Sequence, residues 1–207
     1  MPITTYFHRF LPGSDPGLNP LLLLHRTGGS ESDLIDVAGQ IAPGASRLAV
    51  RGNVLEDGKA RFFRRLAKGH FDLEDLALRT QELAEFLDAA RSTYSAQRPI
   101  AFGFSNGANI AMSLLLARPE ILRAAILLRP MWAYEPTVAQ PLGGLPVLVI
   151  AGRDDTTVSP ERAQRVADFL RGVGAEVSFR WARGAHDLTQ DDTDIASGWL
   201  RRIAPAD

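Results

Sequence analysis

Ser105 lies in a sequence context that is typical of a serine nucleophile. Residues 103 to 107 read Gly-Phe-Ser-Asn-Gly, and they follow an apolar stretch and precede a helical pattern. In a Gly-X-Ser-X-Gly turn the serine hydroxyl is exposed above a sheet, and small Gly103 and Gly107 let the strand and helix backbones pass closely. The turn also places Ser105 at a helix N-terminus, which favours a negative oxygen nearby. The backbone N–H of Asn106 is therefore a candidate donor to an oxyanion.

His186 is the histidine best placed to act as the base. A serine hydroxyl is a poor nucleophile until a base takes its proton, and the chain order that accompanies this serine motif is serine, acid, histidine. Of the four histidines, His186 alone follows the last predicted strand and leads into the final helix. His8 is expected on an edge strand or the surface, and His70 is expected in a loop.

The acid is expected in the loop that follows the apolar residues 147 to 150. That loop contains Asp154 and Asp155, and it ends where Ser159 is a plausible helix N-cap. Physical reasoning alone leaves the two carboxylates nearly tied, and one of them is a solvated turn residue. Asp187 is adjacent to the histidine in sequence and is badly placed to orient its ring.

Composition limits the class of protein. The 207 residues are a normal length for a single α/β domain spanning 1 to 207, and 23 basic and 24 acidic residues give a net charge of −1. This balance argues against nucleic acid or anionic lipid as a partner and favours a small molecule. The absence of cysteine excludes disulfides, thiolate metal sites and a cysteine nucleophile. With no signal-like start and no long apolar run, a cytoplasmic protein without a membrane segment is expected.

Apolar runs alternate with helical patterns along the chain. Continuous apolar runs indicate strands that are covered on both faces, and regular alternation with helices indicates a parallel sheet. We expect about seven strands, mostly parallel, with helices on both faces and no lid domain. The strands are expected near residues 3–11, 21–24, 47–50, 100–104, 124–128, 147–150 and 176–182, the first and last at opposite edges. The helices are expected at 32–41, 73–93, 107–117, 160–171 and 192–203.

The longest irregular piece is expected at about residues 52 to 71. It is too short for a separate domain, but Phe62 and Phe63 could lie over a cleft at the strand ends. The alternative is that both rings pack in the core, and the two interpretations carry equal weight.

The sequence resembles the bacterial carboxylesterase and phospholipase branch of the α/β-hydrolases, which includes small esterases related to the acyl-protein thioesterases. The resemblance extends over nearly the whole chain and implies an α/β-hydrolase fold, a serine esterase activity and a plausible homodimer. The matching segments are LLLLHRTGGSESDL (21–34), RFFRRL (61–66), GFSNGANIA (103–111), LLRPM (127–131), AGRDDTTVSP (151–160) and GAHDLT (184–189).

The resemblance also implies roles for residues that spacing leaves open. The acid of the family belongs to a Gly-X-X-Asp-X-X-Val pattern, which maps onto Gly152, Asp155 and Val158 and favours Asp155 over its neighbour. The family's first-strand motif implies that the backbone N–H of Thr27 forms the other half of the oxyanion hole. His25 would then be a scaffold residue.

Arg26 departs from the family, which usually has glycine at this position. Its side chain could constrain the turn that aims the Thr27 N–H, or its guanidinium could recognise a polar or anionic part of the substrate. The competing interpretation is that Arg26 points into solvent.

The expected reaction is hydrolysis of a carboxylic ester through an acyl-enzyme on Ser105, with His186 as the base and Asp155 as its orienting acid. No metal or organic cofactor is required. Met131 and Trp132, together with the two phenylalanines above, could form an apolar wall for a short acyl chain or a small aromatic ester. Alternatives are a thioesterase or lysophospholipase with the same triad, and a binding protein that Arg26 has made inactive.

Overall fold

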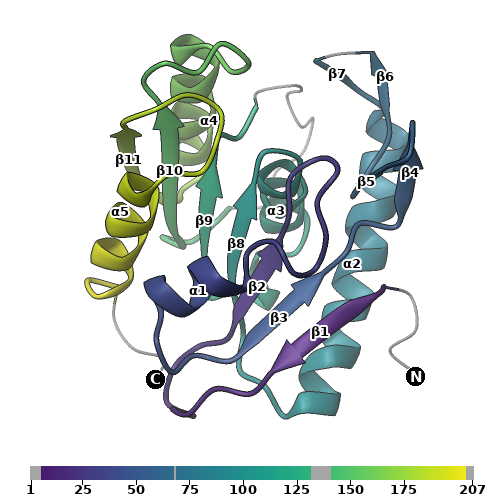
Figure 1. Ribbon diagram of the computed structural model, residues 1–207, viewed down its shortest axis with the longest axis vertical. Helices are drawn as coiled ribbons and strands as arrows, with labels where there is room; N and C mark the ends of the chain where they lie inside the picture. Colours follow the sequence, from purple (N-terminus) through teal and green to yellow (C-terminus); the bar gives the residue numbers. More distant parts are fainter. Residues whose placement is uncertain (1–5, 68, 132–140, 204–207) are drawn as a thin grey trace.

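A mostly parallel sheet forms the centre of the molecule (Figure 1). The computed structural model describes residues 6–67, 69–131 and 141–203. The sheet order is β1-β3-β2-β8-β9-β10-β11, in which β1 is antiparallel to β3 and every other neighbouring pair is parallel. Its strands are β1 (His8–Leu11), β2 (Leu21–Leu24), β3 (Arg47–Val50), β8 (Ile100–Phe104), β9 (Ala124–Leu128), β10 (Pro146–Gly152) and β11 (Glu176–Ala182). All seven expected strands are confirmed, including the two edges.

The inner strands β2, β8 and β9 are apolar throughout because both faces of the sheet are covered there, whereas the edge strands β1 and β11 include polar, partly exposed residues. Side chains alternate between the faces along each strand. In β2, for example, Leu22 and Leu24 belong to one buried cluster, while Leu21 and Leu23 belong to the cluster on the opposite face. Each face therefore has its own hydrophobic cluster, and the cluster under α2, α3 and α4 is the larger of these two.

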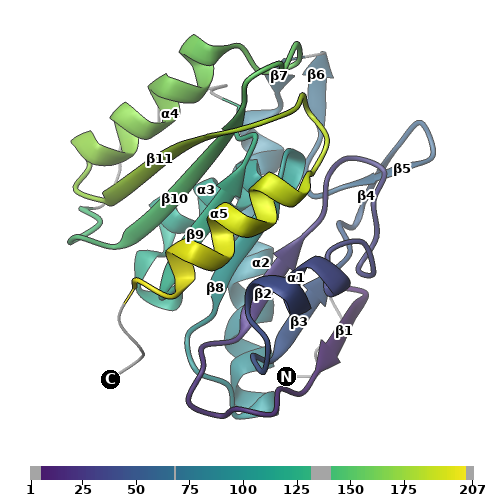
Figure 2. The same cartoon turned by 60° about the vertical axis from the view of Figure 1, so that its left-hand side comes forward.

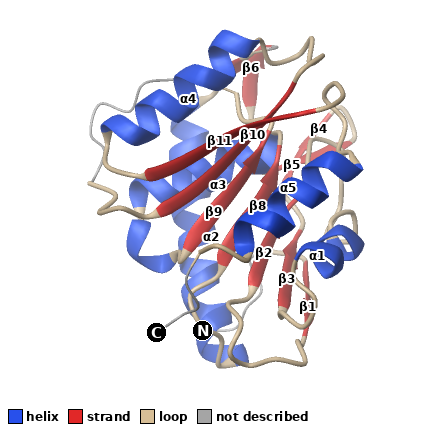
Figure 3. Ribbon diagram, turned by 90° about the vertical axis from the view of Figure 1, so that its left-hand side faces the viewer, coloured by secondary structure: helices blue, strands red, loops and turns tan. Residues whose placement is uncertain are grey.

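In the described part of the chain, five α-helices cover the two faces. They are α1 (Ile35–Ile41), α2 (Leu73–Tyr94), α3 (Asn106–Ala117), α4 (Pro160–Gly172) and α5 (Gln190–Leu200), and a short 3₁₀ helix, η1 (Pro119–Ile121), follows α3. Helices α2, α3 and α4 pack on one face, and α1 and α5 lie side by side on the other (Figures 2 and 3). Ser159 caps α4 by accepting the Arg162 N–H, as expected. None of the described helices is long and apolar enough to cross a bilayer.

The segment at residues 52 to 71 is not irregular as expected. It forms two small hairpins, β4 (Val54–Glu56) with β5 (Lys59–Arg61), and β6 (Arg65–Ala67) with β7 (His70–Phe71). The first hairpin turns at Asp57 and Gly58, whose φ angles are 50° and 73°, which is the backbone of a type I′ turn. The placement of His70 in a loop was therefore also wrong, because it pairs within the second hairpin.

The carboxyl ends of β2, β8, β10 and β11 meet along one edge of the sheet, at the top in Figure 1. This edge is where open α/β sheets usually bind their ligands. The chain leaves β8 at Ser105, and the loops after β2, β10 and β11 contain Thr27, Asp155 and His186. Residues far apart in sequence therefore converge on the end of the central strand.

Candidate active site

Ser105 adopts the strained turn that its motif predicts. Its φ is 54° and its ψ is −109°, a backbone conformation that residues other than glycine rarely adopt. Packing around the turn leaves no space for side chains at the flanking glycines. A Cβ on Gly107 would lie 1.9 Å from the Leu24 carbonyl oxygen, and a Cβ on Gly103 would lie 2.5 Å from the Gly107 carbonyl oxygen. The close approach of helix α3 to the sheet therefore fixes the position of the serine.

A chain of hydrogen bonds joins Ser105, His186 and Asp155. The Ser105 Oγ lies 2.9 Å from His186 Nε2, and His186 Nδ1 lies 2.8 Å from Asp155 Oδ2. Because a carboxylate accepts hydrogen bonds, the Nδ1 of the neutral ring carries the proton and Nε2 is free to accept the serine proton. The arrangement has the connectivity of a serine, histidine and aspartate triad.

The Asp155 side chain is fully buried and held in place by backbone groups. Its Oδ1 accepts the N–H groups of Thr157 and Val158, at 2.7 and 2.9 Å, which leaves Oδ2 for the histidine. Asp154 is exposed, and its backbone N–H donates to the Gly184 carbonyl oxygen in the histidine loop. Of the two candidate acids, the structure brings Asp155 to the histidine.

Thr27 and Asn106 both line the cavity that contains the serine hydroxyl. Asn106 is the first residue of α3, so its backbone N–H belongs to the unpaired N-terminal turn. Among the described residues, none accepts a hydrogen bond from either backbone N–H. Both donors are therefore available for an oxyanion.

His25 braces the loop that contains Thr27. Its Nε2 accepts the Gly52 N–H at 2.9 Å, so its Nδ1 carries the proton and donates to the Arg26 carbonyl oxygen at 2.6 Å. Burial lowers the pKa of His25 from its ordinary value, and the hydrogen bond to Arg26 partly offsets this effect. The ring is neutral, which suits the scaffold role that the family resemblance implies.

Arg129 is a buried residue that the sequence analysis missed. It follows β9, and its side chain is 1% exposed while that of its partner Asp192 is 2% exposed. Its guanidinium donates to both carboxylate oxygens of Asp192 and to the carbonyl oxygens of Ala185 and Asp187. These two carbonyls flank His186, so Arg129 anchors the loop that contains His186.

The cavity at Ser105 has a volume of about 450 Å³. It is lined by Thr27, Lys59, Arg61, Arg65, Gly69, Phe71, Ser105, Asn106, Asn109, Met131, Thr157, Arg162 and His186. Met131 is thus in the expected position, and its N–H is held by Asn109 Oδ1 at 2.8 Å. Trp132 lies outside the described residues.

The apolar wall expected from Phe62 and Phe63 does not form. Both side chains are 0% exposed and belong to the core. The Phe62 ring packs on the His25 ring, and its N–H donates to Asn106 Oδ1 at 2.8 Å, while Phe63 packs on Phe71. Neither residue lines the cavity at Ser105, so the core alternative is correct.

Arg26 does not line the cavity of the serine. It borders a neighbouring pocket with Phe104 and Asp187, and it forms an ion pair with the latter. The expectation of a direct contact between Arg26 and the substrate has no support here, and the side chain is not simply solvated either. Among the described residues, no cluster of histidine, aspartate and glutamate side chains is arranged to hold a metal ion.

Comparison with known proteins shows extensive similarity. No protein-family model matches the chain. The chain is 44% identical over 185 residues to the protein named "Putative hydrolase MhqD" of Bacillus subtilis (strain 168), and the match covers 88% of this chain and 92% of that relative. A carboxylesterase of Bacillus cereus is similar in structure, with a TM-score of 0.93 at 42% identity, over 96% of this chain and 95% of that one. A carboxylesterase from Mesorhizobium loti is also similar in structure, with a TM-score of 0.90 at 32% identity. That match covers 96% of this chain and 95% of the other.

Proposed function

Because this chain belongs to the carboxylesterase family of the α/β-hydrolases and is an ester hydrolase, we propose that Ser105, His186 and Asp155 are its catalytic triad. The observation that carries the proposal is the unbroken series of hydrogen bonds from the serine hydroxyl through the imidazole to the buried carboxylate. The substrates are carboxylic esters, and a cavity of about 450 Å³ supports a small one, with a short acyl chain or a small aromatic group.

In the first half of the reaction, Ser105 Oγ forms a bond to the ester carbonyl carbon while His186 Nε2 takes the hydroxyl proton. The carbonyl oxygen becomes an oxyanion. When the tetrahedral intermediate collapses, the bond from carbon to the leaving oxygen breaks, and His186 returns the proton to that oxygen. An alcohol leaves, and the acyl group remains on the serine. Asp155 holds the ring and stabilises the imidazolium that forms in between.

In the second half of the reaction, water takes the place of the alcohol, and the same steps of addition and collapse occur on the acyl-enzyme. His186 takes a proton from water as its oxygen adds to the acyl carbon, and collapse releases the carboxylic acid and restores the serine hydroxyl. The backbone N–H groups of Thr27 and Asn106 stabilise both oxyanions. Loss of one such donor costs about 2.7–4 kcal/mol of transition-state stabilisation in comparable sites.

Hydrolysis of p-nitrophenyl esters of increasing acyl length tests the proposal, with Ser105→Ala as the variant that removes only the nucleophile. We expect kcat to fall by a factor of about 10⁶ in the variant if the triad acts as a unit. Equal rates in the two proteins would refute the role of Ser105. A matched acyl thioester in the same assay separates an esterase from a thioesterase.

A further inference from the structure

The cavity at Ser105 is lined by four cationic side chains: Lys59, Arg61, Arg65 and Arg162. Three of them come from the hairpins that begin with β4 and β6, and Arg162 lies in the first turn of α4, on the opposite side. Of the described lining residues, none is an aspartate or glutamate. A catalytic cavity for a neutral ester has no need for such a lining.

Arg61 is the most informative of the four because it is almost completely buried. Its side chain is 5% exposed, and it donates through Nη1 to the Thr27 Oγ1 at 2.8 Å and through Nε to the Phe63 carbonyl oxygen at 3.2 Å. No acceptor for its Nη2 exists among the described residues. Burial lowers the pKa of this guanidinium from its ordinary value, although arginine stays protonated in proteins. The Arg61 guanidinium is therefore a buried cation beside Ser105 whose Nη2 is available to donate a hydrogen bond to an anion.

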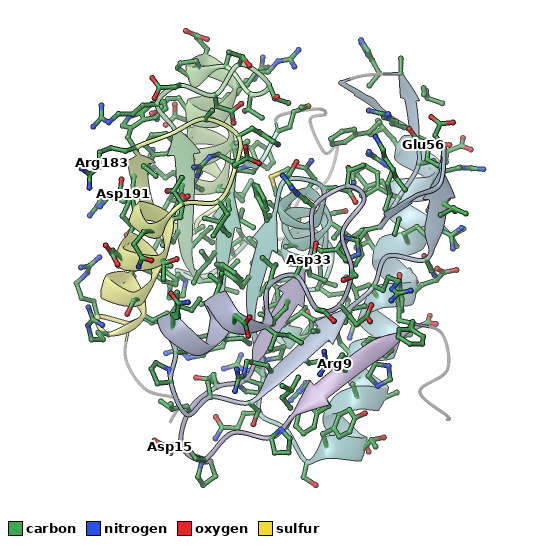
Figure 4. The ribbon with its side chains drawn as sticks, in the orientation of Figure 1. Arg9, Asp15, Asp33, Glu56, Arg183 and Asp191 are labelled. Carbon is green, nitrogen blue, oxygen red and sulfur yellow. The ribbon has the colours of Figure 1, made fainter. Side chains whose placement is uncertain are left out.

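The nearby negative charge does not balance these cations. Glu56, on the β4 side of the hairpin (Figure 4), pairs with both Arg61 and Arg65. Within the described part of the chain, no carboxylate lies within ion-pair distance of Lys59 or Arg162. The lining therefore holds four cations, and Glu56, which lies outside the lining, is the one carboxylate among the described residues that pairs with any of them.

Arg162 also extends across the cavity mouth. A Cβ on Gly69 would lie 3.7 Å from the Arg162 Nη1, so the guanidinium reaches the turn between β6 and β7. Cations then stand on both sides of the entrance. A cleft lined by one sign of charge with low-dielectric walls focuses its field and raises the local concentration of the opposite ion.

We infer that this cavity selects esters that carry a second, anionic group, a carboxylate or phosphate, which Arg61 contacts and which Lys59 and Arg162 attract. The inference rests on the proposed function, since it names the substrate class for the same site. Guanidinium groups suit both anions because both present paired oxygens.

Two matched esters test the inference. One is the monoethyl ester of adipic acid, and the other has a primary amide in place of the distal carboxylate; a phosphate-terminated ester is a third arm that ranks the two anions. We expect kcat/KM to be at least about tenfold higher for an anionic ester, and this preference to shrink as ionic strength rises. Equal kcat/KM for anionic and neutral esters would overturn the inference while leaving the esterase function intact.

Charge-removing variants locate the effect. Arg61→Gln removes structural hydrogen bonds and is at risk of misfolding, so Lys59→Gln and Arg162→Gln carry the test. We expect each to lower the ratio of kcat/KM for the anionic ester to that for the neutral one by several-fold. Arg171→Gln is the matched control, because Arg171 lies at the other end of α4 and does not line the cavity. An unchanged ratio in both test variants would contradict the inference.

Binding to the Ser105→Ala protein gives a readout that does not depend on turnover. Calorimetry should show adipate binding more tightly than adipamide, with weaker adipate binding after Arg162→Gln is added. If no ester is hydrolysed in a Ser105-dependent manner, the proposed function fails and this measurement still decides the inference. Equal binding of adipate and adipamide would reject it.

Discussion

Arg26 Nη1 lies 2.8 Å from Oδ1 of Asp187, the residue that directly follows His186. The ion pair joins the loop that contains Thr27 to the loop that contains His186. Both side chains are well exposed, at 50% and 81%, so the pair adds only about 0–1 kcal/mol to stability. Its effect is expected on the relative position of the two loops, and hence on catalysis.

Removal of either partner should therefore lower activity more than stability. We expect Arg26→Ala and Asp187→Asn each to reduce kcat/KM by a factor of about 2–30, the range of ~0.5–2 kcal/mol seen for coupled positions. The double variant should lose little more than either single variant, because both remove the same contact. Ester kinetics and thermal unfolding of the unmodified protein, the two single variants and the double variant measure these changes in activity and stability. Additive losses would show that the two residues act independently.

Asp155 and Asp154 form a matched pair for testing the acid. Asp155→Asn keeps the size of the side chain but lets the histidine adopt the wrong tautomer, so kcat should fall by about 10⁴, as for the aspartate of other serine triads. Asp154→Asn makes the same chemical change one residue away, on an exposed side chain, and should leave kcat close to that of the unmodified protein. A comparable loss in both variants would contradict the assignment.

The sequence pattern was sufficient to predict the central sheet and much of the geometry of the candidate site. Continuous apolar runs such as that of β8 mark strands buried on both faces, and Ser105 follows from its flanking glycines. Val158 belongs to the same family pattern as Asp155, and its N–H donates to the Asp155 carboxylate. These features are local, so short stretches of sequence encode them.

Other features depend on contacts between distant segments. Strands of only two or three residues are too short to show alternation, so the hairpins at 54–71 escaped prediction, although the Asp57–Gly58 pair was an available signal for the first turn. Phe62 is buried by its contacts with His25 and Asn106, which no sequence pattern links to it. The cationic lining was missed for the same reason, because only the fold brings Arg162 opposite the hairpins.

Arg129 should be essential to the position of the histidine loop. Arg129→Met leaves Asp192 buried without its partner, which costs about 3–5 kcal/mol for pairs of this kind. Urea unfolding measures the loss, and residual folded protein should show reduced kcat. Adding Asp192→Leu should recover part of the stability, because the unpaired charge is then gone. A change below about 1 kcal/mol in the single variant would contradict the account.

The buried His25 predicts a loss of stability in mild acid. Its folded pKa is lowered by burial, so the unfolded chain binds the proton more readily. The stabilising contribution is present above the unfolded pKa of about 6.5 and is lost as the pH falls below it. Protonation would also place a proton on Nε2, facing the Gly52 N–H.

His25→Asn keeps a donor for the Arg26 carbonyl but cannot titrate. The free energy of unfolding of the variant should therefore decline less between neutral and mildly acidic pH than that of the unmodified protein. Urea unfolding across this pH range gives the change of the unfolding free energy with pH for both proteins. Identical slopes would show that His25 is not the titrating group.

The most direct test of the triad is covalent labelling with a p-nitrophenyl phosphonate, followed by mass spectrometry of the intact chain and its peptides. A phosphonate forms a stable analogue of the tetrahedral intermediate on an activated serine. The account predicts one adduct per chain, located on Ser105, with loss of esterase activity in proportion to labelling and no adduct in Ser105→Ala. An adduct on a different residue, or full activity in a chain labelled at Ser105, would contradict it.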